Sequence, residues 1–292
     1  MSSLHGIVLK TARAHEHLAV LEAKVDSYIA DRGIVGEFEP DTSEYVFRVS
    51  GEPPPLDWGI LVGEFAHNLR SSLDNLLWAL IEARGRRPSP ANQFPIFESP
   101  TVKKRKGCEV VDAPTQTRIA EMTQGVRKDD RTFIEEAQPY HEGPYAARDP
   151  LALLGHLNNL DKHRFIHPAV AALALRRYGE APLPFFPGVN VFMKRGIPAG
   201  NPLPIADFPW PTRRRDISKT LSFTFNPPSD DRTEILRAQI VTSGSHPEME
   251  VDPGAPFHVS LSDRSRPVLI ADLYRIYRRV VEIRDRFAGV IG

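Results

Sequence analysis

Apolar residues recur at the spacing of an amphipathic helix in four long stretches of the chain. These stretches are residues 4–31, 57–84, 150–167 and 267–289. In the second stretch the apolar positions are three or four residues apart: Leu61, Phe65, Leu69, Leu73, Leu76 and Leu80. Such a stripe has to be buried against another element. The four stretches therefore predict a four-helix bundle.

The region before the last helix has a different pattern. Proline-rich turns separate short segments typical of strands, at 189–193, 221–225, 234–241 and 257–260. Because so few short strands are not stable alone, we expect a small antiparallel β element packed on the bundle. One further strand is predicted at 44–49. The predicted fold class is α+β, mostly α, with a helical bundle domain at 1–180, a β-rich insertion at 181–262 and a C-terminal helix at 263–292 that completes the bundle.

Composition limits the classes of function. Lys plus Arg equals Asp plus Glu, at 37 each, and Cys108 is the only cysteine. The balance excludes a global field that recruits nucleic acid, and one cysteine excludes an internal disulfide or a cysteine-built zinc site. No apolar run reaches about 18 residues, and the N-terminus lacks the apolar core of a signal peptide. We therefore expect a cytoplasmic protein with no membrane partner. A basic run at 103–106, within a predicted loop at 86–115, is either solvated or a local contact for RNA phosphates.

The helix predicted at 57–84 carries an unusual polar face opposite its leucines. This face lacks lysine and includes a tryptophan, and its members are Glu64, His67, Ser71, Asp74, Asn75 and Trp78. Arg70 lies at its edge, four residues before Asp74, so the two side chains can touch. The face is either solvated, or it lines a polar cleft or a helix–helix interface.

The helix predicted at 150–167 begins at a good capping pair, Asp149 and Pro150. It places four polar residues on one stripe: His156, Asn159, His163 and His167. Asp161 falls instead on the apolar side, where a carboxylate needs a partner. Arg70 is the natural candidate for a structural ion pair with Asp161. That pair either contributes to a site or only ties the two helices together.

The motifs resemble a widespread group of bacterial proteins with no assigned activity. The resemblance covers about residues 1–170, and it is carried by His67, Asn68, Leu69, Arg70, Leu73 and Asp74, then Phe94, Pro95 and Ile96, then Gln138 and Pro139, and finally Asn158, Asn159, Asp161, Lys162, His163 and Arg164. A broader likeness is to HEPN-type helical bundles, many of which are metal-independent ribonucleases built around an arginine and a following histidine. That likeness assigns the arginine to Arg70 but places Asn75 at the histidine position, which implies a degenerate active site unless His67 or His163 substitutes.

Three functional hypotheses follow. The first is a HEPN-like RNA-binding or ribonuclease-type protein, without a cofactor and with homodimerisation as a further option. In it His67, Arg70 and His163 are catalytic, and Asn68, Asp74 and Asn159 bind the substrate.

In the second, the bundle resembles DinB-like hydrolases and binds one divalent metal, such as zinc, iron or manganese, through His67, His163 and His167. In the third, the protein is a non-catalytic interaction protein whose polar seam fixes the register of its helices.

Overall fold

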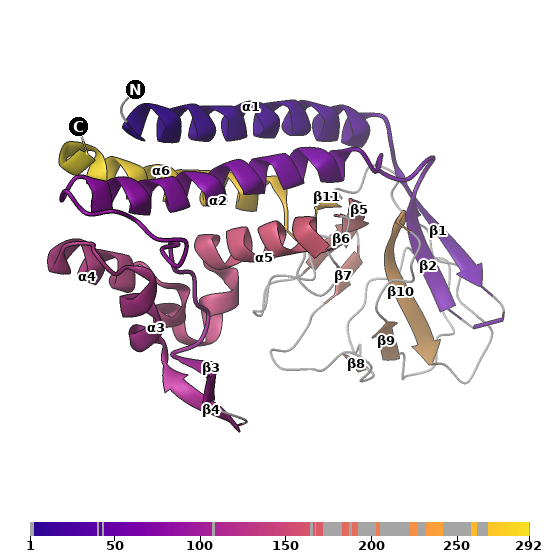
Figure 1. Cartoon of the computed structure of the whole chain (residues 1–292). Coiled ribbons are helices and arrows are strands. Elements are labelled where there is room, and N and C mark those ends of the chain that lie inside the picture. The colour runs from indigo at the N-terminus through magenta and orange to yellow at the C-terminus, as the bar shows by residue number, and fades with distance from the viewer. Residues whose placement is uncertain are drawn as a thin grey trace. The chain divides into compact units, whose positions relative to one another are not determined.

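The structure is a computed structural model, shown in Figure 1. It describes residues 3–39, 41–42, 44–106, 109–163, 166, 168–171, 183–186, 189–191, 203–204, 222–226, 232–241, 258–261 and 268–291. This part of the chain is mostly helical, as the apolar spacing predicts. The chain divides into two compact units: a helical unit (1–22, 59–166 and 268–292) and a β-rich unit (23–58 and 167–267).

The long helices of the structure follow the four predicted stretches. They are α1 (Ser3–Ala30), α2 (Trp58–Glu82), α5 (Pro150–His163) and α6 (Ile270–Ile291). Shorter helices lie between α2 and α5, namely α3 (Thr115–Met122), α4 (Lys128–Glu136) and the 3-10 segment η1 (Pro139–Arg148). No described helix is both long enough and apolar enough to cross a membrane.

The predicted apolar stripes form the core of the helical unit. Leu69, Leu73 and Leu76 of α2 have no exposed surface, and Leu273, Ile276 and Val280 of α6 are equally buried. Each such side chain contributes about 1.5–3 kcal/mol relative to an exposed one. The helices are therefore held together mainly by the residues that define their periodicity.

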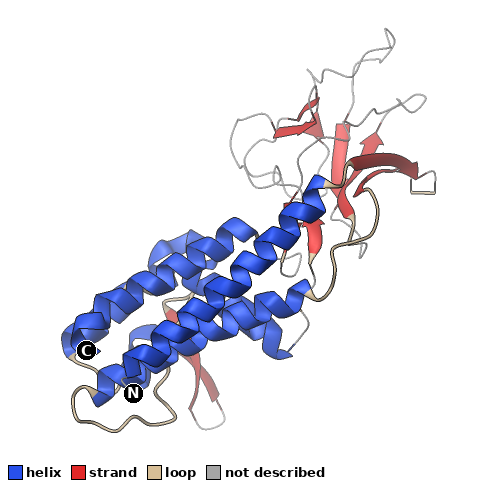
Figure 2. Ribbon diagram, turned by 90° about the horizontal axis from the view of Figure 1, so that it is seen from above, coloured by secondary structure: helices blue, strands red, loops and turns tan. Residues whose placement is uncertain are grey.

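Polar contacts at the edge of this core show how its helices run. Tyr274 donates its hydroxyl to Glu22 at 2.6 Å, and Arg284 donates to the hydroxyl of Thr11 at 2.8 Å. Residue numbers rise along α1 as they fall along α6, so the two helices are antiparallel. Figures 1 and 2 show the helices of this unit side by side, with both chain ends at the same end of the unit.

The predicted cap of α5 is present. Oδ1 of Asp149 accepts the backbone N–H groups of Leu151 at 2.8 Å and Ala152 at 3.4 Å. These bonds satisfy donors that the first helical turn leaves free. Burial nevertheless raises the pKa of Asp149, and the opposing effects of these N–H groups and of Arg279 are smaller.

The basic run at 103–106 lies in a hairpin and not in a loop. Strand β3 (Thr101–Lys106) pairs in antiparallel register with β4 (Glu109–Pro114). The prediction of a continuous loop was wrong here because strand pairing, which satisfies the backbone groups of both segments, overrides a composition that is poor for strands.

The β-rich unit draws its main sheet from two distant parts of the chain. Its strand order is β1 (Ile34–Glu39), β2 (Glu44–Val49), β10 (Glu234–Val241), β9 (Ser222–Asn226) and β8 (Leu203–Pro204), and every neighbouring pair is antiparallel. Two small pairs complete the described strands: β5 (Ala169–Ala171) with β11 (His258–Ser260), and β6 (Leu183–Phe186) with β7 (Val189–Val191).

The sheet changes the expected boundaries of the β element. Because β10 pairs with β2, the strands β1 and β2 belong to the same sheet as β8, β9 and β10. The predicted division assigned the strand at 44–49 to a helical bundle domain at 1–180, whereas the structure places this strand and β1 in the β-rich unit. An antiparallel partner can come from any distance along the chain, so local pattern does not identify it.

Candidate functional site

Two charged residues of the first motif form a pair on α2. Arg70 and Asp74 are one helical turn apart, and Nη2 of Arg70 donates to Oδ1 of Asp74 at 2.9 Å. The Arg70 side chain is only 15% exposed. Spacing alone predicts this contact, but not the direction in which the pair faces.

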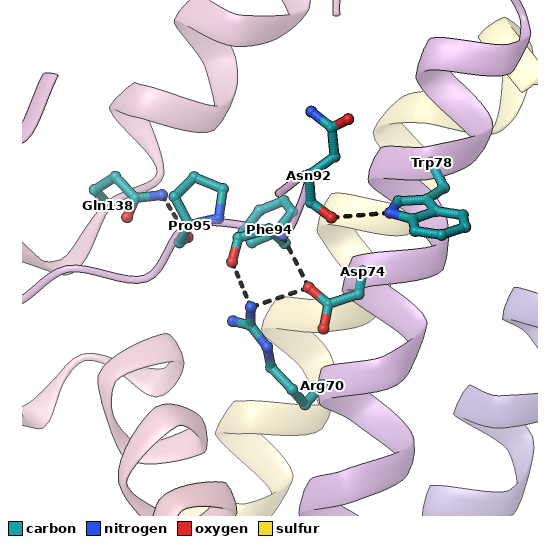
Figure 3. Close-up of polar contacts among 7 residues, drawn as sticks. All are labelled: Arg70, Asp74, Trp78, Asn92, Phe94, Pro95 and Gln138. Atoms are coloured by element: carbon teal, nitrogen blue, oxygen red, sulfur yellow. Dashed lines mark hydrogen bonds and ion pairs between the residues drawn. The ribbon is translucent and has the colours of Figure 1, made fainter. Parts of the chain in front are cut away.

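The pair faces the backbone of Phe94, in the loop that follows α2. Oδ1 of Asp74 accepts the Phe94 N–H at 2.8 Å, and Nη2 of Arg70 donates to the Phe94 carbonyl at 2.6 Å. Figure 3 shows the three groups closing a small ring. Both backbone groups of Phe94 are thus satisfied by one ion pair, while its side chain is fully buried. Hydrogen bonds to charged groups are the stronger kind, at about 1.5–3 kcal/mol each.

Trp78, one helical turn after Asp74, contacts the same loop at Asn92, two residues before Phe94. Its indole Nε1 donates to the carbonyl of Asn92 at 2.8 Å (Figure 3). The buried Asn92 amide in turn donates to the carbonyls of Met122 and Gln124, both at 3.0 Å. Asn92 therefore joins the loop to the end of α3.

Gln138 holds the other side of the loop. Its Nε2 donates to the carbonyls of Pro95 at 3.0 Å and Ile134 at 2.8 Å, and its Oε1 accepts the Phe97 N–H at 3.1 Å. We call Arg70, Asp74, Trp78, Asn92 and Gln138 the loop clamp. Two motif groups that lie far apart in the sequence, around Arg70 and around Gln138, thus act on one short segment of backbone.

The predicted ion pair between Arg70 and Asp161 is not formed, and this prediction was wrong. Asp161 is exposed, although the helical wheel placed it on the apolar side of α5. Its carboxylate lies against the backbone of Gly63, where an added Cβ would be 2.7 Å from Cγ of Asp161. Gly63 is seven residues before Arg70, roughly 10 Å along the axis of α2. The side chain of Arg70 points instead to a nearer acceptor, the carbonyl of Phe94.

The other predicted site residues do not join the clamp. His67 and Asn159 are exposed and take part in no hydrogen bond or ion pair within the described chain. Asn68 donates its amide to the carbonyl of Glu64 in its own helix at 2.8 Å. The side chain of His163 and the whole of His167 lie outside the described residues. Of the six predicted catalytic and substrate-binding residues, the clamp contains only Arg70 and Asp74.

A metal centre finds no support among the residues that the structure describes. In that part of the chain no three His, Cys, Asp or Glu side chains lie close enough together to hold an ion. The side chains of the proposed ligands His163 and His167 lie outside the described part of the chain, so their set with His67 stays a hypothesis.

Sequence reasoning missed Asn92, whose side chain makes four hydrogen bonds, whereas the side chains of Arg70 and Asp74 make two each. The available signal was a polar residue three positions after Ser89, since the Asn92 carboxamide oxygen accepts the Ser89 N–H at 2.8 Å in a local turn. Its contacts to Met122 and Gln124 have no local signal.

Comparison with family models, with curated proteins and with solved structures found no match for this chain. The function of this chain is therefore inferred from the clamp and from exposed side chains of the helical unit.

Proposed function

We propose that this protein is a non-catalytic interaction protein of the cytoplasm whose α1, α2, α5 and α6 form a four-helix bundle fixed by the loop clamp. One observation carries the proposal. Nη2 of Arg70 donates to Asp74 and to the Phe94 carbonyl, so the arginine that was expected to be catalytic stabilises the fold instead. A catalytic arginine has to present its guanidinium to the substrate, whereas the guanidinium of Arg70 donates hydrogen bonds within its own chain.

The interaction surface that we propose is the outward side of α1. Leu9 and Val20 are 55% and 48% exposed there. They are separated by about three helical turns and so lie on the same side of the helix. The residues between them on this side are small or form an exposed ion pair, in which Arg13 donates to Glu16 at 2.7 Å. We call Leu9, Arg13, Glu16 and Val20 the α1 outer face.

The order of residues on the α1 outer face favours a second copy of the chain as its partner. The midpoint between Leu9 and Val20 is also the midpoint between Arg13 and Glu16. In an antiparallel two-fold pairing, Leu9 therefore meets Val20 of the partner subunit, and Arg13 meets Glu16 of the partner subunit. A two-fold interface requires this self-complementarity, and the central charges then have opposite signs.

Molar mass measured by light scattering across a range of protein concentrations tests the proposal. The wild type is expected to be a dimer, and Leu9→Glu with Val20→Glu a monomer. Arg13→Glu or Glu16→Arg alone brings like charges together and should weaken the dimer, while the double exchange restores it. Ile60→Glu is the matched control, because Ile60 on α2 is also 55% exposed. A wild type that stays monomeric at high concentration would contradict the proposal.

HEPN-like RNA processing remains a second candidate, and the exposed imidazole of His67 supports it. Purified protein incubated with single-stranded RNA and a chelator would then cleave it, and His67→Ala would remove cleavage. That result would replace the interaction hypothesis with catalysis. Uncleaved RNA together with metal-free protein would leave the interaction hypothesis standing.

A further inference from the structure

A partly exposed tryptophan ring lies near the end of α2. Trp78 is 42% exposed, although tryptophan is a large apolar residue. Its indole Nε1 donates to the Asn92 carbonyl at 2.8 Å, as Figure 3 shows, and this bond fixes the orientation of the ring. The ring is therefore held at its polar edge, while part of its apolar surface stays open to solvent.

The helix α2 ends in a glycine turn that contains arginines. Gly85 has φ +66°, a backbone conformation that favours glycine. The Gly85 N–H donates to the Glu82 carbonyl at 2.8 Å, and the Arg86 N–H donates to the Ile81 carbonyl at 3.3 Å. These are the two bonds that close a helix at a left-handed glycine. The turn therefore fixes the backbone of Arg84 and Arg86 on either side of Gly85.

The same turn packs the stem of Arg86 and leaves its charge outside. In such turns the residue after the glycine commonly makes an apolar contact with the last helical turn. A Cβ added to Gly125 would lie 3.1 Å from Cγ2 of Ile81 and 3.8 Å from Cδ of Arg86. The aliphatic part of Arg86 thus lies beside Ile81, whereas the residue as a whole is exposed.

Three exposed arginines follow one another closely here, namely Arg84, Arg86 and Arg87. Among the described residues, none of them has a carboxylate at ion-pair distance. Arg118, by contrast, is exposed but lies 2.9 Å from Glu121. The carbonyl end of a helix favours basic residues, but that effect falls off within the last turn, and Arg87 lies beyond it. Three charges at this end of α2 therefore stay available to an outside anion.

The chain after Arg87 folds back to Trp78. The Ser89 N–H and hydroxyl both donate to Oδ1 of Asn92, at 2.8 and 3.0 Å, and the Asn92 carbonyl accepts the indole N–H. Arg87 is two residues before Ser89, so its backbone lies within about 7 Å of this turn. Arg84 is six residues after Trp78, roughly 9 Å along the helix. The ring and the arginines therefore belong to one end of the helical unit.

We propose that Trp78, Arg84, Arg86 and Arg87, which we call the α2 end patch, bind a segment of single-stranded nucleic acid. Guanidinium groups without an internal partner suit phosphate oxygens, and an exposed aromatic ring stacks on a base of any kind. Only unpaired bases are free to stack in this way, which favours a single strand over a duplex. An acidic peptide would match the charges but would provide no base for the ring.

The α2 end patch is independent of the proposed dimer, because none of its residues belongs to the α1 outer face. It is also distinct from the HEPN-like candidate. Trp78 is eleven residues after His67, roughly 16 Å along α2. His67→Ala and Leu9→Glu should therefore bind an oligonucleotide as the wild type does. Loss of binding in His67→Ala would place the nucleic acid elsewhere and overturn the proposal.

Fluorescence anisotropy of a short labelled oligouridylate, measured with the full chain across a range of sodium chloride concentrations, tests the arginines. Each phosphate contact on a single strand contributes about 0.7 to the slope of log affinity against log salt. Arg84→Gln combined with Arg87→Gln should therefore lower this slope by about 1.4 and weaken binding about tenfold or more. Arg275→Gln combined with Arg278→Gln removes the same charge from exposed positions of α6 and should change neither.

Tryptophan emission tests the ring. A base stacked on Trp78 should quench the emission of the wild type, and Trp78→Phe should lose this quenching. An oligoglutamate with the same number of charges serves as the competitor. If it binds as tightly as the oligouridylate, charge alone explains the binding and the proposal is wrong. A parallel titration with oligothymidylate distinguishes the two sources of the strand: tighter binding of one oligomer identifies RNA or DNA as the ligand, and either result supports the patch.

A measurement on the wild type covers the case in which a variant does not fold. Ultraviolet light cross-links bound oligouridylate to the residues that it contacts, and mass spectrometry of the digested protein locates them. The cross-links should fall on Trp78 and on the segment 84–87. Cross-links confined to other segments would contradict the proposal, as would a wild type that does not bind.

Discussion

Oδ1 of Asp74 accepts the backbone N–H of Phe94 at 2.8 Å, while the Asp74 partner, Arg70, donates to the carbonyl of the same Phe94 at 2.6 Å. One ion pair thus replaces the strand or helix partners that a buried backbone segment otherwise needs. The loop can then cross the core without regular secondary structure. This relationship explains why an arginine and an aspartate stand four residues apart on a helix that is otherwise largely buried.

We predict that Arg70→Ala lowers the free energy of unfolding by about 2–3 kcal/mol, because it leaves the Phe94 carbonyl without a donor and Asp74 without its counter-charge. Urea unfolding followed by circular dichroism measures the change. Arg118→Ala removes the same kind of contact at the surface, a 2.9 Å pair with Glu121, and should cost less than about 0.5 kcal/mol. Equal losses in the two variants would rule out a special role for the clamp.

Hydrogen exchange should separate the two sides of the clamp. Asp74→Ala is expected to speed exchange of the Phe94 amide, and Gln138→Ala that of the Phe97 amide, because each variant removes the acceptor of that one N–H group. Gln116→Ala, at an exposed glutamine, serves as the control. If both amides respond alike to both variants, the loop opens as one unit and the two contacts are not separable.

Gly63→Ala tests the close approach of α2 and α5. The new methyl would overlap the carboxylate of Asp161, which has to move, although alanine favours a helix over glycine by about 1 kcal/mol. We expect Gly63→Ala alone to leave the melting temperature unchanged or lower. Gly63→Ala combined with Asp161→Ala should raise it, because the overlap is gone. A rise with the single substitution would show that Asp161 does not lie against Gly63.

The cap of α5 should give a pH-dependent stability. The folded-state pKa of Asp149 is raised, so the folded chain binds more protons than the unfolded chain between the ordinary aspartate value and the raised value. This contribution therefore falls as pH rises through that window. Asp149→Asn keeps a capping acceptor without the buried charge, so it should be more stable than the wild type at neutral pH. The gain should vanish below the ordinary pKa of aspartate.

The control for this pH profile is Asp149→Ala, which loses the cap. It should cost about 1 kcal/mol at low pH, where the wild-type carboxyl is neutral and still accepts hydrogen bonds. Unfolding free energies of the three proteins measured from acid to neutral pH decide the matter. A difference between Asp149→Asn and the wild type that does not change with pH would remove burial as the cause.

The sequence by itself was sufficient to predict the long helices and the side of each helix that is buried. Leu69, Leu73 and Leu76 repeat at a spacing that only a helix places on one side, and hydrophobic burial then decides which side faces inward. The contact between Arg70 and Asp74 follows from the same local geometry, as does the cap that Asp149 provides for α5. Each of these depends on residues within about one helical turn.

Contacts between residues that lie far apart along the chain were decided by the tertiary structure. The sequence pattern offered two kinds of acceptor for Arg70, namely Asp161 and the polar groups after α2. The path of the loop places the Phe94 carbonyl 2.6 Å from the Arg70 guanidinium. The pairing of β2 with β10 joins residues close to 200 positions apart. Such contacts follow from the packing of whole elements, because the strength of a hydrogen bond or an ion pair depends on distance in space and not on separation along the chain.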